Sequence, residues 1–392
     1  MARLIVVDLD DQTRVPFLRG ILTRSLQKAG LTFERSYKVA SQVRDEIADL
    51  GEITTADLRK RVLAHLKPLG TEVAGRYRKP RRTIPNVLVE STDGHRTPYS
   101  RGRHSLDLLA CGLTPDEATP ITDGLYMELM AKRKTGITTD ELRALTADHI
   151  IRALGDEAAE RYQVWQDFRD SRRPLVILIG GAVGSGKSTI ATELAHRLDV
   201  VRIQSTDMLR EVLRTMISRR LLPALHESTF TAWTTLPPTG AGGDRSELLE
   251  AGYLAQADLV SVAVEGVIKR AIRERVPLIL EGVHIHPAFL DRIERRDDVV
   301  IVPLVLAVLK RKQLKERIAG RSRRAPSRRA ERYLKHFDEI WQLQSALLAQ
   351  ADQAGVPIIA NEDRDATVHE AVRVILEALA CEALASEAQR QP

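Results

Sequence analysis

A buried strand that runs directly into a glycine-rich loop is the feature that most constrains this 392-residue chain. Residues 175–180 read LVILIG, a continuous apolar run typical of a parallel strand that is covered on both faces. The loop at 181–189, GAVGSGKST, matches the pattern G-x-x-x-x-G-K-[ST], and a helix-like segment follows it. This order of elements predicts a phosphate-binding loop in an α/β fold.

The residue types in this loop suit the binding of a nucleotide's phosphates. The glycines let successive backbone N–H groups curve around phosphate oxygens. Lys187 supplies a point charge for the β- and γ-phosphates, and the hydroxyl of Ser188 is suited to Mg²⁺. We therefore expect ATP and Mg²⁺ as cofactors. The expected nucleotide contacts are Gly181, Gly184, Ser185, Gly186, Lys187, Ser188 and Thr189.

Strand-like and helix-like segments alternate from this loop toward the end of the chain. Such alternation predicts a parallel sheet with helices on both faces, and 171–392 is long enough to form a domain of this kind. The predicted strands are 175–180, 200–204, 277–281, 299–306 and 357–360. The predicted helices include 188–198, 208–219, 246–274 and 326–354.

Two acidic residues follow strands of this sheet, at the edge where open α/β sheets bind ligands. Glu281 ends the strand LILE and joins Ser188 as a candidate Mg²⁺ ligand. The alternative is that Glu281 is an acid at the protein surface with no role in metal binding. Asp207 could orient an acceptor hydroxyl or accept its proton, or it could be a helix N-cap. Arg210 and Arg214 share a helix face with Asp207 and could hold an anionic acceptor; a solvated face is the alternative.

Two histidines follow Glu281 at close spacing. His284 and His286 have no third metal ligand near them in the sequence, so they do not form a metal site by themselves. His284 could contact the acceptor, and a structural role is the alternative.

A strongly cationic segment follows the fourth predicted strand. Residues 310–335 hold four lysines and eight arginines against two glutamates, a net charge of +10, while the whole chain carries +6. In a kinase a lid occupies this position, and its arginines stabilise the charge on the transferring phosphoryl group. A nucleic-acid-binding patch or a solubilising helix is the alternative. Proteins that bind single strands stack the bases on aromatic side chains, and aromatic residues are only 4% of this chain. We expect a small anionic substrate and no nucleic acid, with Arg321 and Arg324 as catalytic lid residues.

The first 165 residues contain a duplication. Four blocks recur in the same order at offsets of 82 to 85 residues; for example, RVPFLRG at 14–20 recurs as RTPYSRG at 96–102. We therefore predict two small, mostly helical α+β units joined by the basic segment 78–85. These repeats also offer surfaces for association into a homo-oligomer. The predicted domains are 1–80, 86–165 and 171–392.

The cysteine content and the short apolar runs favour a cytoplasmic location. Cys111 and Cys381 are too few for a disulfide scaffold or a four-ligand zinc site. The longest apolar stretch, 299–309, is far shorter than the ~20 residues that span a bilayer. The N-terminal apolar run is too short for a signal peptide, so we expect no membrane association.

The predicted sheet domain resembles archaeal-type 2-phosphoglycerate kinases over essentially all of 171–380. The resemblance rests on GGAVGSGKST, STDMLREVLR, HESTFTAW, VEGVIKRA, LILEGVHIHP, RSRRAPSRRAERYLKHF and IIANED. That family transfers the γ-phosphoryl group of ATP to the 3-hydroxyl of 2-phosphoglycerate, which gives 2,3-bisphosphoglycerate. The resemblance implies that Ser228, Thr229 and Trp233 line the acceptor pocket and that Asn361 lies near the adenine.

The two repeats resemble ATP-cone domains, which are nucleotide-binding regulatory modules. A usual cone opens with a basic strand end followed by Asp-Gly, whereas the first copy reads VVDLDDQT and the second VESTDGHR. These departures leave two interpretations open. Either the repeats bind nucleotide, with Arg19 and Arg101 as phosphate contacts, or they only pack or dimerise.

Three functions are consistent with these observations. The first is phosphorylation of 2-phosphoglycerate, as the resemblance implies. The second keeps the fold and changes the acceptor to another phosphorylated metabolite, a sugar or a sugar nucleotide. The third is a nucleotide-sensing regulator without turnover, which would not need Asp207 and Glu281.

Overall fold

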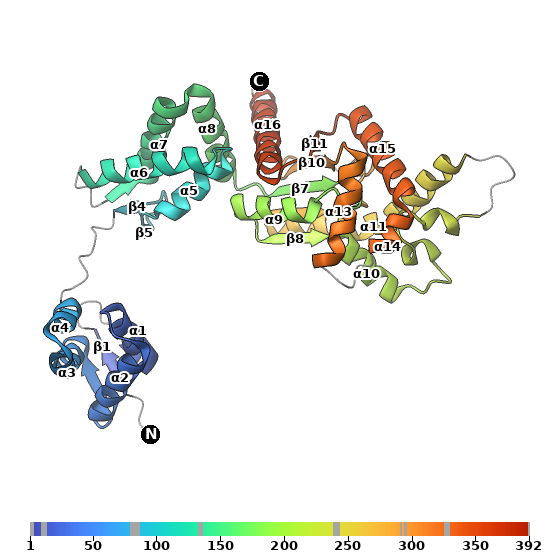
Figure 1. Ribbon diagram of the computed structural model, residues 1–392. Helices are drawn as coiled ribbons and strands as arrows, with labels where there is room; N and C mark the ends of the chain where they lie inside the picture. The colour runs from blue at the N-terminus through green and yellow to red at the C-terminus, as the bar shows by residue number, and fades with distance from the viewer. Residues whose placement is uncertain are drawn as a thin grey trace. The chain divides into compact units, whose positions relative to one another are not determined.

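A computed structural model describes residues 4–8, 14–78, 87–131, 136–237, 244–290, 292–293, 296–324 and 330–390 (Figure 1). Its backbone contacts divide the chain into two compact units, Met1–Asn86 and Val87–Pro392. The first unit holds the first repeat. The second unit holds the second repeat together with the sheet domain. Most of the predicted linker at 78–85 lies outside the described residues.

The first unit is a three-stranded sheet covered by helices. Strand β1 (Ile5–Val7) pairs antiparallel with β2 (Arg14–Pro16) and parallel with β3 (Glu52–Thr54). Leu26, Val43 and Val62 lie on the inward faces of three of its helices and form part of the core. The helices are α1 (Arg19–Lys28), α2 (Phe33–Ile47), α3 (Thr55–Leu66), η1 (Lys67–Leu69) and α4 (Thr71–Arg78).

The second repeat has the same build. In the first repeat Val6 of β1 faces Ile53 of β3, and in the second Val89 of β4 faces Ile137 of β6. The prediction of two small units, each with strands and helices, is thereby confirmed. The strands are β4 (Leu88–Glu90), β5 (Arg96–Pro98) and β6 (Gly136–Thr138). The helices are α5 (Arg101–Ala110), α6 (Pro115–Ala131), α7 (Thr139–Leu154) and α8 (Asp156–Ser171).

A five-stranded parallel sheet in the order β11-β10-β7-β9-β8 confirms the predicted α/β fold. The strands are β7 (Leu175–Gly180), β8 (Arg202–Ser205), β9 (Leu278–Glu281), β10 (Val300–Ala307) and β11 (Ile358–Ala360). The longer helices around it are α9 (Lys187–Arg197), α10 (Thr206–Met216), α11 (Arg245–Glu274), α13 (Arg311–Arg324), α15 (Phe337–Gln353) and α16 (Arg364–Arg390). The short ones are η2 (Pro223–His226), η3 (Ala232–Thr235), α12 (Pro287–Leu290) and α14 (Ala330–Lys335).

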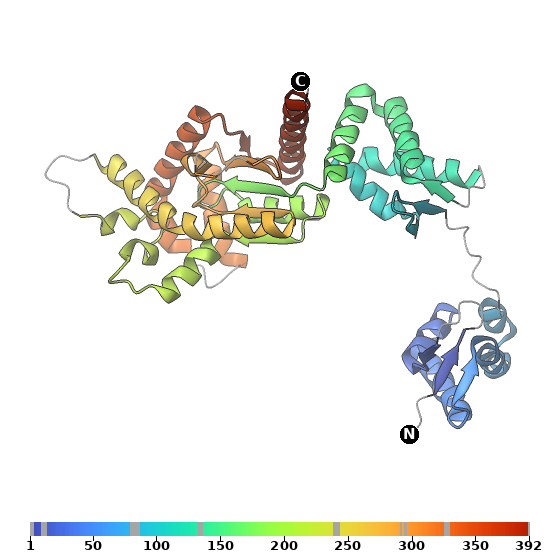
Figure 2. The same ribbon diagram turned by 180° about the vertical axis from the view of Figure 1, so that it is seen from behind.

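Alternate residues of β7 point to opposite faces of the sheet, as the pleat of a strand requires. Ile177 and Ile179 pack with α9 and α16, and Val176 and Leu178 pack with α11, which crosses the other face (Figure 2). Because both faces are covered, the strand can be apolar throughout, and this explains the LVILIG run.

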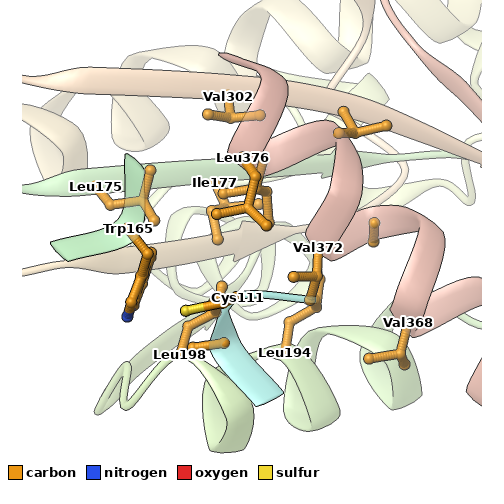
Figure 3. Close-up of a cluster of buried hydrophobic side chains, with 14 of the residues drawn as sticks. Cys111, Trp165, Leu175, Ile177, Leu194, Leu198, Val302, Val368, Val372 and Leu376 are labelled. Carbon is orange, nitrogen blue, oxygen red and sulfur yellow. The ribbon is translucent and has the colours of Figure 1, made fainter. Parts of the chain in front are cut away.

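The second repeat shares a core with the sheet domain. Cys111 and Trp165 of the repeat belong to the same buried cluster as Leu194 and Leu198 of the α9 segment (Figure 3). A Cβ built on Gly112 would lie 3.5 Å from a methyl of Leu376 on α16. The repeat and the sheet domain therefore form one compact unit, and separate folding of 171–392 stays a prediction.

The single helix predicted over 326–354 is wrong. The structure has two helices there, α14 and α15, and residues 325–329 lie outside the described part. His336 stands between them as the N-cap residue of α15, with φ −110° and ψ 29°. This departure from helical dihedrals separates α14 from α15.

Helix α11 is the one described helix that is long and apolar enough to cross a membrane by length and composition. Core helices of globular domains pass the same test. Here Val260, Val264 and Ile268 of α11 are buried in the cluster that contains Val176 and Leu178 of the sheet. The apolar length of α11 is therefore used in packing against the sheet.

The shared core predicts how fragments behave. The fragment 87–392 should fold and unfold cooperatively. The fragment 171–392 should be insoluble or melt roughly 10 °C lower or more, because it exposes the apolar side chains of α9 and α16 that α5 and α8 cover. Thermal unfolding followed by circular dichroism compares the two. Equal melting temperatures would show that the second repeat adds nothing to the core.

Candidate active site

The phosphate-binding loop is held in one shape by a backbone carbonyl and a side-chain amide packed directly behind it. A Cβ built on Gly181 would lie 2.4 Å from the carbonyl oxygen of Leu306 on β10. A Cβ built on Gly186 would lie 2.3 Å from Nδ2 of Asn361. Both glycines also have positive φ, 135° and 93°. Only glycine satisfies the space and the backbone conformation at these two positions.

The loop lysine is buried inside this cradle. Lys187 is the first residue of α9, and its Nζ donates to the carbonyl oxygen of Ala182 at 2.8 Å. The same Nζ lies 3.5 Å from Oγ of Ser185, which is fully buried. The ammonium group is therefore already in the loop and close to the N-terminus of a helix, an arrangement that favours anions.

Ser188 and Glu281 meet beside the loop. The hydroxyl of Ser188 donates to Oε1 of Glu281 at 2.9 Å, and Glu281 is only 6% exposed at the end of β9. Among the described residues, no group of three His, Cys, Asp or Glu side chains could hold a metal. Mg²⁺ in kinase sites takes one or two protein oxygens and completes its shell with phosphates and water. The serine–glutamate pair fits that requirement.

Asp207 lies in the first turn of α10, and it is not the N-cap. The cap is Ser205, whose Oγ accepts from the N–H of Asp207 at 3.2 Å. The Asp207 carboxylate is exposed and makes no hydrogen bond within the described part of the chain. A carboxylate that is not used by its own helix is free to act on a ligand.

Arg210 and Arg214 have different surroundings. Nη1 of Arg210 donates to the carbonyl oxygens of Leu225 and Glu227 at the end of η2. Its Nε is buried and, among the described atoms, has no hydrogen-bond partner. Arg214 pairs with Glu211 at 2.8 Å on a half-exposed helix face. Arg210 therefore fixes the η2 turn, and Arg214 remains on the surface of α10.

His284 is the centre of a buried polar network. Its Nδ1 lies 2.8 Å from Oγ1 of Thr206, and its Nε2 lies 3.2 Å from Oε1 of Gln256. The amide of Gln256 donates to the carbonyl oxygens of Ala224 and Glu227, so its Oε1 must accept from His284. These contacts assign the proton to Nε2 and make Nδ1 the acceptor for Thr206.

This network keeps His284 neutral. Burial lowers the pKa of His284 to about 4, although the nearby charge of Asp207 acts in the opposite direction. Both ring nitrogens are bonded to protein, so the structure places His284 as a residue that positions its neighbours. Sequence reasoning missed Thr206 and Gln256; a polar residue on the buried stripe of α11 was the available signal for Gln256.

The segment 228–233 is anchored to the same network. Thr229 is buried. The backbone carbonyl oxygen of Glu227, two residues earlier, accepts hydrogen bonds from the side chains of Gln256 and Arg210. The backbone of Trp233 packs on Gly252 of α11, where a Cβ would lie 2.3 Å from the Trp233 Cα. The structure thus links Ser228, Thr229 and Trp233 to the elements that carry Asp207 and His284.

Asn361 and the cationic helix α13 lie behind and beside the loop. Nδ2 of Asn361 donates to the carbonyl oxygen of Ser185 at 2.7 Å, so this side chain supports the loop directly. Arg317 of α13 reaches the carbonyl oxygen of Glu362 at 3.2 Å, and its Nη1 lies 3.9 Å from the Cβ position of Gly186. Arg317 belongs to the cationic segment 310–335, and no sequence pattern distinguishes it from the other arginines there. The side chains of Arg321 and Arg324 lie outside the described residues.

The first unit contains a separate basic cavity of about 1240 Å³. Arg19, predicted as a phosphate contact, lines it and stacks on the ring of Tyr37 at 4.3 Å. Four other arginines line the same cavity: Arg24, Arg44, Arg59 and Arg76. The matching Arg101 of the second repeat pairs with Asp123 at 3.2 Å and lies over Tyr126. The two repeats therefore present different surroundings to equivalent arginines.

A parallel sheet, a strand–loop–helix cradle with a buried lysine and an acid at the end of the neighbouring strand define a P-loop nucleotide-binding domain of the kinase type. Residues 176–340 match the family described as an AAA domain.

The chain belongs to the 2-phosphoglycerate kinase family. It is 37% identical over 290 residues to the 2-phosphoglycerate kinase of Pyrococcus horikoshii, a match that spans 74% of this chain and 93% of the relative. It is 37% identical over 279 residues to that of Methanopyrus kandleri, spanning 71% and 84%. With the protein of Methanocaldococcus jannaschii the identity is 34% over 297 residues, spanning 76% and 93%. The family predicted from the sequence motifs is confirmed.

The tight packing at Gly282 predicts a steric effect on the network. A Cβ at Gly282 would lie 1.7 Å from Oγ1 of Thr206, so Gly282→Ala should destabilise the protein by about 2 kcal/mol or more. Gly320→Ala on α13 is the control, since no described atom lies within 4 Å of its Cβ position and alanine favours a helix. Urea unfolding measures both. Equal effects would contradict this reading of the Gly282 contact.

The neutral His284 predicts a pH dependence. Its folded pKa of about 4 lies below the ordinary value near 6.5, so lowering the pH from 7 to 5 protonates it mainly in the unfolded chain. The free energy of unfolding should fall by about 2 kcal/mol from this group over that range. His284→Asn should remove that share of the slope in urea unfolding. An unchanged slope in His284→Asn would contradict this assignment. His104 is also buried, with a pKa of about 4, but it contributes equally to wild type and to His284→Asn.

Proposed function

We propose that this protein is an ATP-dependent kinase that phosphorylates the 3-hydroxyl of 2-phosphoglycerate and produces 2,3-bisphosphoglycerate. The observation that carries the proposal is the family match, which spans 93% of a relative called 2-phosphoglycerate kinase at 37% identity. The geometry around Lys187, Ser188 and Glu281 supports phosphoryl transfer at this site.

The donor side of the mechanism uses the phosphate loop. Backbone N–H groups of the loop and the N-terminus of α9 bind phosphate oxygens. Nζ of Lys187 gives up its hydrogen bond to the carbonyl oxygen of Ala182 and donates to a phosphate oxygen. Ser188 and Glu281 would hold Mg²⁺, which supplies charge neutralisation across the β- and γ-phosphates. Asn361 keeps the carbonyl of Ser185 turned away from the phosphates.

The acceptor side uses the end of β8 and α10. Asp207 orients the acceptor hydroxyl and accepts its proton during in-line transfer. The acceptor carries a carboxylate and a phosphate, and these require cations. Arg214, the remaining N–H groups of Arg210 and the lid arginines supply them, with Arg321 and Arg324 closing over the transferring group. Thr229, with Ser228 and Trp233, borders the acceptor on the side of η2 and η3.

A second function is favoured by the cavity of the first unit. Five arginines line a space of about 1240 Å³, which suits a phosphorylated ligand. Together with the ATP-cone resemblance, this cavity supports nucleotide binding by the first repeat as a regulatory function. Arg19 would be one of its phosphate contacts.

The role of Asp207 is tested by Asp207→Asn. The change keeps the shape of the side chain and removes the base, so turnover should fall by about 10²–10⁴-fold. The affinity for ATP, measured by calorimetry, should stay nearly unchanged. Asp352→Asn, on the exposed surface of α15, is the control and should keep full turnover. Undiminished turnover of Asp207→Asn would remove this residue from the chemistry.

The acceptor is tested by ADP release across phosphorylated three-carbon acids, sugars and sugar nucleotides. We expect 2-phosphoglycerate to give the highest kcat/KM. A better response to another acceptor would support the same fold with a different substrate. If no acceptor is turned over while ATP still binds, the protein acts as a nucleotide sensor.

A further inference from the structure

A second cavity lies at the amino-terminal edge of the sheet, where the second repeat meets the sheet domain. Its volume is about 520 Å³, within the range of small-molecule sites. The walls come from α5 and α8 of the repeat, the start of β7, the end of α9 and the turn before β9. The cavity and the phosphate loop therefore lie at opposite ends of β7 and α9, because both elements run from one to the other.

A buried donor without a partner belongs to one of the residues that line this cavity. Trp165 of α8 is only 5% exposed, and its indole Nε1 makes no hydrogen bond with any described residue. Its ring packs in the cluster with Leu175 and Leu198, which also line the cavity (Figure 3). Nε of Arg173, another lining residue, is likewise buried without a partner. A buried N–H group without an acceptor costs free energy, so two residues of this lining carry a hydrogen-bonding requirement that the described chain does not meet.

The cavity is also lined by arginines. Arg169 pairs with Asp107, Arg173 with Glu382 and Arg197 with Glu193. The other three arginines of the lining form no ion pair with any described carboxylate. They are Arg103, Arg172 and Arg275.

Backbone strain is concentrated at the same place. Of the residues that the structure describes, three that are not glycine have positive φ: Arg172 at 53°, Asp199 at 54° and Arg275 at 51°. All three line this cavity, at the ends of α8, α9 and α11. Glycine is the usual residue at such helix ends, because a side chain there is strained. The chain thus carries strained side chains where they face one cavity, a pattern associated with functional sites.

The duplication supplies an independent argument. In the first repeat, Ile21, Arg24 and Ser25 of α1 line the basic cavity. At the repeat offset of 82 these positions correspond to Arg103, Leu106 and Asp107 of α5, which line the second cavity. The same helix face therefore borders a cavity in both copies. In the first copy the opposite wall belongs to the repeat itself, whereas in the second it belongs to the sheet domain.

We propose that this composite cavity is a second ligand site, which binds a nucleotide and is built jointly by the second repeat and the sheet domain. The apolar wall formed by Leu106, Trp165 and Phe168 accommodates the base. Arg103, Arg172 and Arg275 bind the phosphates. A ligand here contacts the ends of β7 and α9, so its binding bears on the phosphate loop at their other ends.

The binding is tested by ¹⁹F NMR of the full chain labelled with 5-fluorotryptophan. The chain has three tryptophans, and Trp165→Phe assigns the resonance of Trp165. ATP, AMP, tripolyphosphate and 2,3-bisphosphoglycerate are the probes, each added to wild type and to Lys187→Ala. We expect ATP or AMP to shift the Trp165 signal saturably in both proteins and at least about 10-fold more tightly than tripolyphosphate.

Three results would overturn the proposal. No shift at millimolar nucleotide means that the cavity is not a site. A shift that disappears in Lys187→Ala means that the signal reports the active site. Equal binding of tripolyphosphate or 2,3-bisphosphoglycerate means that the site recognises phosphate alone and not a nucleotide.

Glycine variants separate binding from a purely structural role. Arg172→Gly and Arg275→Gly remove a strained side chain, so each should raise the melting temperature by about 2 °C. Each should also lower the affinity for nucleotide, measured from the Trp165 resonance, by about 10-fold or more. If the arginines only cap helix ends, nucleotide binding will not change.

The effect on the kinase reaction is a separate readout. Saturating AMP should change the KM for ATP less in Trp165→Phe than in wild type, because the first repeat and the ATP site are the same in both proteins; equal changes would show that the composite cavity does not act on the reaction. This readout rests on the proposed function, whereas the NMR shift does not, so failure of one is distinguishable from failure of the other.

Discussion

The close contact between the phosphate loop and the chain packed behind it is the constraint on which the rest of this site depends. Gly180, Gly181 and Gly186 each lack a Cβ where one would meet the carbonyl of Ile285, the carbonyl of Leu306 or the amide of Asn361. The loop and the strand end before it are therefore packed against β10 and against the segments that follow β9 and β11. Because the loop cannot move without moving the sheet, the phosphate cradle exists before any ligand arrives, and such preorganisation favours catalysis.

The acceptor side is held by a different kind of contact. There the network of Thr206, His284 and Gln256 ties α10, α11 and the η2 turn together through buried hydrogen bonds. Buried networks of this kind specify one arrangement when every member is satisfied. Since α11 also packs on the sheet, the donor and acceptor sides share one support.

Local patterns revealed the loop, the five strands and Glu281, because each depends on residues adjacent in sequence. The contacts of Asn361 with Ser185 and of Arg210 with η2 join distant segments, and no spacing predicts them. The interpretation of His284 changed for the same reason, since its partners come from α10 and α11. The merging of the second repeat with the sheet domain was also hidden, because a repeat shows that a fold recurs and not what each copy packs against.

The central claim is that the cradle at 181–189 is formed in advance and that only its side chains adjust when substrates bind. A crystal structure with a non-hydrolysable ATP analogue, Mg²⁺ and 2-phosphoglycerate tests it most directly. The account predicts an unchanged backbone at 181–189, with Lys187 moved from Ala182 to the phosphates and the metal at Ser188 and Glu281. A rearranged loop, or a metal held elsewhere, would contradict it.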